Sequence, residues 1–185
     1  MKISFNSPLI LSFSLLCVIV LVLTNYLNVM QDWFTLPPTW GSGLKFYFSL
    51  FGQTLGHANL EHLIGNLSFI LLLGPIVEKK FGSKLLLIMM LVTALATSII
   101  NIIFFNTGLL GASGIVFMLI ILTSLLDIKN GEIPLTFILV SIIFIGKEIL
   151  GTFNNDNISH TAHIIGGAIG AVFGFLLINR SNKNQ

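Results

Sequence analysis

Charged residues are scarce in this chain. Asp, Glu, Lys and Arg together make up 9% of the 185 residues, against roughly 25% in soluble domains. Hydrophobic residues make up 55%, and the mean hydropathy is +0.97. A soluble globule of this length needs more polar surface, so the composition excludes one and indicates a membrane protein with several spans.

Cysteine and basic clusters are also nearly absent. The single cysteine, Cys17, excludes an internal disulfide and says little about the redox compartment. The net charge is +2, and no basic cluster exceeds Lys79, Lys80 and Lys84. The sequence therefore carries no nucleic-acid signature, and nucleic acid is not expected as a partner.

Apolar runs predict an all-α membrane protein with six transmembrane helices. No small-residue cleavage site follows the first run, so we interpret it as a retained helix rather than a secretory signal. Asn59 is placed to cap the second helix, and Pro75 is expected to kink it. The predicted spans, within one polytopic domain of residues 1–185, are about 8–26, 60–77, 85–105, 113–126, 133–150 and 161–178.

The distribution of Lys and Arg predicts the orientation. With six spans, both termini share one side with the second-to-third and fourth-to-fifth loops, and that side holds seven of the nine basic residues. The positive-inside rule then places both termini in the cytoplasm. The second, fourth and sixth helices all run inward from the outer face. The seven residues are Lys2, Lys79, Lys80, Lys84, Lys129, Arg180 and Lys183, against Lys45 and Lys147.

The connection from about 28 to 58 is rich in aromatic residues and poor in charge. Trp and Tyr favour the headgroup level, so this loop is expected to lie partly in the membrane interface. An ordinary extracytoplasmic loop fits the composition equally well. The aromatic residues are Trp33, Phe34, Trp40, Phe46, Tyr47, Phe48 and Phe51.

Four polar side chains fall in the first turns of the inward-running helices. They are His62 and Asn66, Ser113, and His163. A polar group in lipid costs free energy and usually serves function. A serine and a histidine from separate helices can form a nucleophile and its base. His62 and Asn66, four residues apart, share a helix face and suit a developing negative charge.

Glycines surround the serine. Gly111 and Gly114 flank Ser113 and let a substrate backbone come close. The helix N-terminus also offers unpaired N–H groups to an oxyanion. Taken singly, small residues in membrane helices more often serve packing.

A second glycine series follows the last histidine pair. Gly166, Gly170 and Gly174 form a bare stripe along which another helix can approach closely. His163 lies about 60° from this stripe, and His160 about 120° from it. The stripe therefore favours His163 as the histidine that faces a neighbouring helix. Viewed singly, His163 could be a structural histidine with its hydrogen bonds satisfied. The pair of His62 and Asn66 could likewise serve hydrogen bonding between helices.

Metal binding is not expected. The chain has four histidines, and their spacing matches neither His-x-x-x-His nor a Glu-bearing metal motif. No cysteine lies nearby. The four are His57, His62, His160 and His163.

Taken together, the motifs closely resemble the rhomboid family of intramembrane serine proteases. The resemblance covers about residues 45–178, and residues 73–83 are similar to that family's second-to-third helix junction. The three-part set is specific, although each piece alone is not. It consists of His57-Ala58-Asn59-Leu60-Glu61-His62-Leu63-Ile64-Gly65-Asn66, Gly111-Ala112-Ser113-Gly114 and Ala162-His163-x-x-Gly166-x-x-x-Gly170.

The resemblance implies a role for each matched residue. Ser113 is the nucleophile and His163 the general base, without an acidic third member, metal or cofactor. The Ser113 backbone N–H, His62 and Asn66 form the oxyanion hole. His57 is structural. The chain departs from the family in the first loop, where Phe48-Ser49 replaces a common Trp-Arg pair.

The expected function is cleavage of single-pass membrane proteins in the outer part of their transmembrane segments. Helix-destabilising residues and small residues near the cut are expected to help. The protein is expected to be a multi-pass protein of a bacterial plasma membrane. Two alternatives remain: a rhombosortase-type enzyme that processes C-terminal sorting tails, and a non-catalytic rhomboid-like binder of transmembrane segments.

Overall fold

Helices make up almost all of the regular structure in the computed structural model, which describes residues 5–105, 107–126, 133–151 and 160–182. Within these ranges the only strand-like pairing is an isolated antiparallel bridge between Leu36 and Leu109. The helices are α1 (Pro8–Leu21), its π-helical extension η1 (Val22–Tyr26), α2 (Gln31–Phe34), α3 (Gly43–Gly52), α4 (Leu60–Phe81), α5 (Ser83–Phe104), α6 (Ser113–Ser124), α7 (Leu135–Gly151) and α8 (His160–Asn182).

Helices lie at each of the six places where the apolar runs predict them. Within the part of the chain that the structure describes, three are long and apolar enough to cross a membrane: Pro8–Tyr26, Leu60–Phe81 and Ser83–Phe104. Asn59 caps α4 as predicted, because its side-chain oxygen accepts a hydrogen bond from the backbone N–H of His62 at 2.8 Å. α4 continues beyond its predicted end at residue 77, with Pro75 inside it. The number of helices that cross the bilayer stays a prediction beyond these three.

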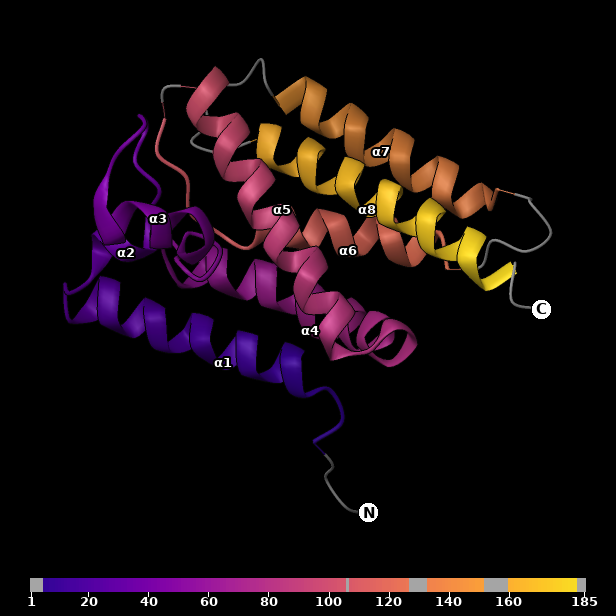
Figure 1. Cartoon of the computed structure of the whole chain (residues 1–185), viewed down its shortest axis with the longest axis horizontal. Coiled ribbons are helices and arrows are strands. Elements are labelled where there is room, and N and C mark those ends of the chain that lie inside the picture. Colours follow the sequence, from indigo (N-terminus) through magenta and orange to yellow (C-terminus); the bar gives the residue numbers. More distant parts are fainter. Residues whose placement is uncertain (1–4, 106, 127–132, 152–159, 183–185) are drawn as a thin grey trace.

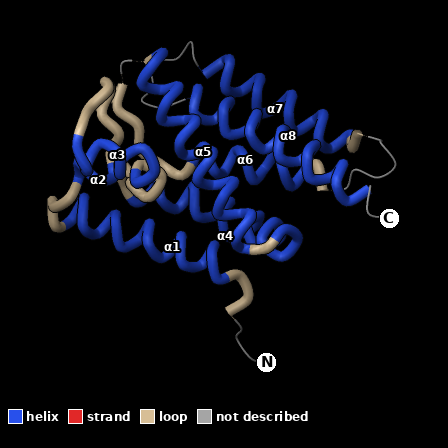
Figure 2. The backbone as a smooth tube through the Cα atoms, in the orientation of Figure 1, coloured by secondary structure: helices blue, strands red, loops and turns tan. Residues whose placement is uncertain are grey.

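The long helices alternate in direction. In Figure 1, α4, α6 and α8 begin near the end of the molecule that carries α2 and α3, and they run toward the opposite end. α1, α5 and α7 run the other way. The tube in Figure 2 shows the same arrangement, coloured by secondary structure. The first turns of α4, α6 and α8 therefore lie toward the same end of the molecule.

α6 forms the centre of the core. Its 12 residues span only about 18 Å, which is less than the hydrocarbon thickness of a bilayer. A helix that is apolar on every side must be surrounded by protein or lipid, and here the neighbours are mainly α8 and α4. Its buried residues are Gly114, Ile115, Val116, Met118, Leu119, Ile120, Ile121 and Leu122.

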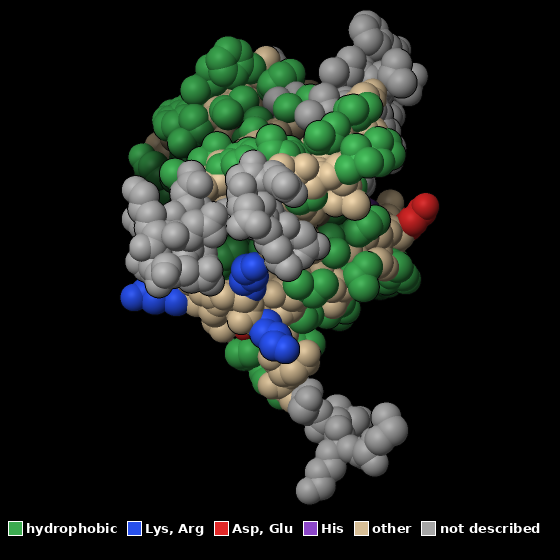
Figure 3. Space-filling view, turned by 90° about the vertical axis from the view of Figure 1, so that its right-hand side faces the viewer, with side chains coloured by type: hydrophobic (Ala, Val, Ile, Leu, Met, Phe, Trp, Pro, Cys, Tyr) green, Lys and Arg blue, Asp and Glu red, His purple; other side chains and the backbone are tan. Residues whose placement is uncertain are grey.

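Large apolar side chains also cover the outer faces of the surrounding helices. Leu15 of α1, Leu72 of α4 and Ile103 of α5 are all exposed. Figure 3 views the end opposite α2 and α3, and hydrophobic side chains occupy much of this face, with Lys and Arg in its lower half. Exposed apolar side chains along the outward faces of the helices, such as Leu15, Leu72 and Ile103, are unfavourable in water and suit contact with lipid. The protein is an integral membrane protein.

The connection between η1 and α4 contains two short helices that the sequence did not predict. α3 buries Phe46 and Leu50 and exposes Leu44 and Tyr47, so one side of it packs on the protein while the other is apolar and open. Trp33 of α2 contacts Phe48 of α3 edge to face, with ring centroids 5.4 Å apart. The exposed aromatic face agrees in character with an interfacial location, and its depth in a membrane stays a prediction.

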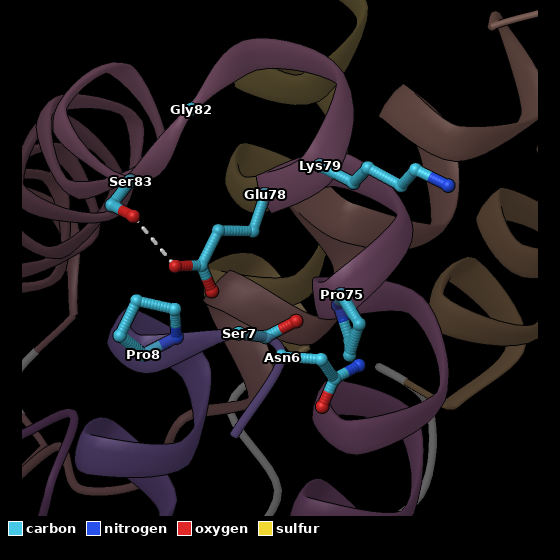
Figure 4. Close-up of a pocket in the computed structure, with 8 residues that line it drawn as sticks. All are labelled: Asn6, Ser7, Pro8, Pro75, Glu78, Lys79, Gly82 and Ser83. Atoms are coloured by element: carbon cyan, nitrogen blue, oxygen red, sulfur yellow. Dashed lines mark hydrogen bonds between the residues drawn. The ribbon is translucent and has the colours of Figure 1, made fainter. Parts of the chain in front are cut away.

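A buried carboxylate joins α1 to the α4–α5 turn. Glu78 accepts hydrogen bonds from the backbone N–H groups of Leu9 at 2.9 Å and Ile10 at 3.0 Å, and from the Ser83 hydroxyl at 2.7 Å. Figure 4 shows Glu78 beside the start of α1, with a cavity of about 440 Å³ next to it. The negative charge lies at the positive end of the α1 dipole, which stabilises both. Glu78 thus attaches the first helix to the core.

Replacing Glu78 by Gln should loosen this attachment. Glutamine keeps the size, but its NH₂ group cannot accept a hydrogen bond, so a buried N–H of α1 loses its partner. We expect the free energy of unfolding to fall by about 1–3 kcal/mol, measured as a lower melting temperature in detergent. Glu61→Gln, at an exposed position of the same helix, is the matched control. Equal melting temperatures for the two variants would contradict this role.

Candidate active site

Ser113 is the first residue of α6, and the chain reaches it through an unusual backbone turn. Gly111 has a φ of +126°, a conformation that favours glycine. A Cβ at Gly111 would lie 2.7 Å from Cε1 of His62 and 2.9 Å from its Nε2. Only a residue without a side chain lets the His62 ring lie against the chain so close to Ser113.

The first turns of α4 bring two polar side chains to the same point. Asn66 follows His62 by about one turn, and its Nδ2 lies 3.8 Å from the Cβ position of Gly111. Asn66 is 7% exposed, and its Nδ2 has no hydrogen-bond partner among the residues that the structure describes. A buried N–H₂ group without a partner is costly. The structure therefore places a spare donor beside the segment that leads to Ser113.

Glycines hold α8 close against α6. A Cβ at Gly166 would overlap the backbone carbonyl of Gly114, and one at Gly170 would overlap the carbonyl of Met118. α6 and α8 form the most extensive helix pair of the described residues. Gly114 lies directly after Ser113, so this packing brings the start of α8 over the start of α6.

His163 packs against the face of α6 that carries Ser113. Its ring stacks on the ring of Phe117, with centroids 4.3 Å apart and planes at 7°. Phe117 follows Ser113 by four residues and so shares its helix face. His163 and Ser113 are both half-buried. The side chain of His160, the other candidate on α8, lies outside the described residues.

Phe117 is a site residue that the sequence reasoning missed. A phenylalanine in an apolar helix carries no chemical signal. Its spacing of four from Ser113 is the only sequence feature that could have indicated it. The flat ring gives the imidazole of His163 a surface on which to stack, which restricts the orientations of that ring.

His57 supports His62 from the loop before α4. The two rings meet edge to face, with centroids 5.1 Å apart. Nδ1 of His57 donates to the Leu55 carbonyl at 3.1 Å, and the ring is 1% exposed. Burial lowers the pKa of His57 to about 4, so the ring is neutral at pH 7. It lies beside His62 without adding a positive charge.

The arrangement supplies the parts of a hydrolytic site. One hydroxyl lies at a helix N-terminus, where backbone N–H groups lack helical partners. The imidazole of His163, from α8, lies against the face of α6 that carries Ser113. The side chains of His62 and Asn66 lie beside Gly111 in the turn before Ser113. Within the described part of the chain, no three His, Cys, Asp or Glu residues are grouped so as to hold a metal ion.

Comparisons with known proteins match the region that contains these residues. Residues 45–180 match the family model for the Rhomboid domain. The chain is 25% identical over 127 residues to "Rhomboid protease GlpG" of Haemophilus influenzae, covering 67% of this chain and 66% of that protein. It is 28% identical over 149 residues to "RHOMBOID-like protein 12, mitochondrial" of Arabidopsis thaliana, covering 67% and 44%. The chain thus spans just under two thirds of the first and less than half of the second.

The glycine contact between α6 and α8 can be tested with two neighbouring substitutions. Gly166→Ala places a methyl group against the Gly114 backbone, and such overpacking should destabilise the protein by about 1–3 kcal/mol. Gly167→Ala meets only Cγ1 of Ile121, at 3.4 Å, and should be neutral or stabilising by up to ~1 kcal/mol through helix propensity. Thermal unfolding in detergent measures both. The contact is refuted if Gly166→Ala melts at or above the temperature of Gly167→Ala.

Proposed function

This chain belongs to the rhomboid family, and on that premise we propose that it is an intramembrane serine endopeptidase. The observation that carries the proposal is the convergence at the start of α6. Gly111 packs against His62 and lies near Asn66, and both of these residues belong to α4. His163 of α8 stacks on Phe117, which shares a face of α6 with Ser113. Family membership alone leaves catalysis open, so the site must support it.

In the proposed reaction, Ser113 is the nucleophile. Its hydroxyl oxygen attacks the carbonyl carbon of the scissile peptide bond, while His163 takes the hydroxyl proton. The bond to the amine then breaks, and His163 returns the proton to the leaving nitrogen. Water then attacks the acyl carbon while His163 takes a proton from it, and His163 returns this proton to the Ser113 oxygen as the acyl-enzyme bond breaks.

The oxyanion of the tetrahedral intermediate needs donors that are already in place. The backbone N–H of Ser113 is one, since the first N–H groups of a helix have no helical partner. Asn66 is the second, and its unpartnered Nδ2 supports the assignment. His62 is the third, lying against Gly111. Donors fixed before the reaction stabilise the developing charge without reorganisation.

The proposed substrates are single-pass membrane proteins. The site lies toward one end of the inward-running helices rather than at mid-height, so it meets the outer part of a transmembrane segment. Helical peptide bonds are shielded, and residues that destabilise a helix near the cut should help. The side-chain positions of Gly111 and Gly114 are already filled by His62, Thr97 and Ala162, so the proposed preference for small side chains at the cut site rests on the family resemblance.

The proposed orientation is based on the distribution of the basic residues. We place both termini in the cytoplasm and assign residues 1–185 to one membrane domain with its rhomboid core near 45–178. We propose that the protein crosses the plasma membrane of a bacterium several times. The alternating helix directions in Figure 1 support this topology. Processing of C-terminal sorting tails would use the same dyad on a narrower set of substrates.

The nucleophile is tested with a fluorophosphonate probe, which reacts with activated serine hydroxyls. Wild-type protein in detergent should be labelled on Ser113 and should cleave a model transmembrane substrate. Ser113→Ala should abolish both, while expression and melting temperature stay nearly unchanged, since one hydroxyl is lost. A chelator should have no effect. Cleavage above background by Ser113→Ala would require another nucleophile, and no wild-type labelling or cleavage would favour a non-catalytic binder.

His160 provides the matched control for the base. His163→Ala should eliminate labelling and cleavage, because no other base reaches Ser113 in the proposed mechanism. His160→Ala removes the same ring three residues away and should retain most activity. The reverse pattern would assign the base to His160.

Asn66→Ala tests the oxyanion hole. Removing one such donor lowers kcat by about 10²–10³-fold, with little effect on substrate binding because the charge develops only in the transition state. Labelling of Ser113 should remain detectable. The measurement is kcat and KM for one substrate, with Ser68→Ala, at an exposed position of α4, as control. Wild-type turnover by Asn66→Ala would assign Asn66 to helix packing.

A further inference from the structure

The loop between η1 and α4 holds the segment that leads to Ser113. Backbone hydrogen bonds run from Leu36 N to Leu109 O at 2.9 Å and from Leu109 N to Leu36 O at 3.1 Å. A third runs from Gly111 N to the carbonyl of Gln53 at 2.8 Å. The segment before the nucleophile is thus attached at two points to a part of the chain more than 50 residues earlier.

Gln53 is itself held in place by its side chain. The residue directly follows α3 and is 1% exposed. Its Nε2 donates to the Ser98 hydroxyl of α5 at 3.4 Å, and that hydroxyl donates to the Leu50 carbonyl at 2.7 Å. Ser98 is fully buried. The Ser98 hydroxyl therefore joins α5 to the last turn of α3, through Leu50 and Gln53.

Stability alone does not account for an amide at this position. Oε1 of Gln53 is buried and has no hydrogen-bond partner among the described residues. A buried carbonyl oxygen without a partner is unfavourable, and a methionine of similar length would fill the same space without that cost. What the amide adds over a methionine is its bond to the Ser98 hydroxyl.

We propose that Gln53 is a positioning residue for the Ser113 nucleophile. The proposal rests on the proposed function. The side-chain amide fixes Gln53 against Ser98, and its carbonyl then fixes the N–H of Gly111. Gly111 holds the positive φ that turns the chain into α6 and lies against His62. An error in its placement shifts the Ser113 hydroxyl and N–H relative to His163, His62 and Asn66.

The test compares Gln53→Met with Thr54→Val in the full-length protein. Gln53→Met keeps the backbone carbonyl and removes only the amide. Thr54 is the matched control, because it is the next residue, is buried, and its hydroxyl donates to the nearby Phe51 carbonyl at 2.8 Å. Gln53→Met should keep the wild-type melting temperature, because the loss of the bond to Ser98 is offset by removal of the unpartnered Oε1, and Thr54→Val should lower it only slightly. Gln53→Met should lower kcat about 10-fold with KM unchanged and slow probe labelling of Ser113 similarly, while Thr54→Val keeps both rates.

Ser98→Ala provides a second route to the same result. It removes the anchor of Gln53 while leaving Gln53 in place, so it carries the test if Gln53→Met does not fold. The double variant should lose no more kcat than the worse single one, because both changes break one connection. The proposal is overturned if Gln53→Met folds and keeps the wild-type kcat. If Gln53→Met does not fold, an unchanged kcat in Ser98→Ala overturns it instead. An equal loss of kcat in Thr54→Val would also overturn it. Failure of the wild type to label or cleave would instead refute the proposed function.

Discussion

Close backbone packing between α6 and α8 is the contact on which the site depends. Gly166 and Gly170 allow α8 to rest on the backbone of α6 near Gly114 and Met118. Inside a membrane no hydrophobic force drives helices together, so van der Waals contact at short range must do so. This contact brings His163 over Phe117, one turn from Ser113. A side chain on the glycine stripe would separate His163 from Ser113, the two groups of the proposed dyad.

The polar groups of the site occupy an apolar protein at little cost, because most of them are attached locally. Asn59 caps the helix that carries His62 and Asn66, and His57 donates to the Leu55 carbonyl of its own turn. Two buried site atoms lack a partner among the described residues, Nε2 of His57 and the donor Nδ2 of Asn66. A buried donor left without a partner in the resting protein is suited to a charge that forms only during reaction, which connects the packing of α4 to the proposed chemistry.

Local chemistry explains which parts of the structure could be predicted. The apolar runs predicted helices at the right places, because burying backbone polar groups in lipid leaves few alternatives to a helix. Asn59 was a recognisable cap. α2 and α3 were not predicted, since aromatic residues in a loop carry no helical period. The predicted end of α4 and start of α5 were wrong by four and two residues, because the turn between these helices is set by the long-range bonds of Glu78 to α1.

The sequence by itself determined the class of protein, its helical segments, its family motifs and the residue types available for chemistry. All of these follow from composition and short spacings. The tertiary structure alone decided that Gly111 lies against His62, that Phe117 supports His163, and that Gln53 anchors the segment before Ser113. These contacts join residues tens of positions apart. No local pattern encodes them, because they arise only when whole helices pack in one particular register.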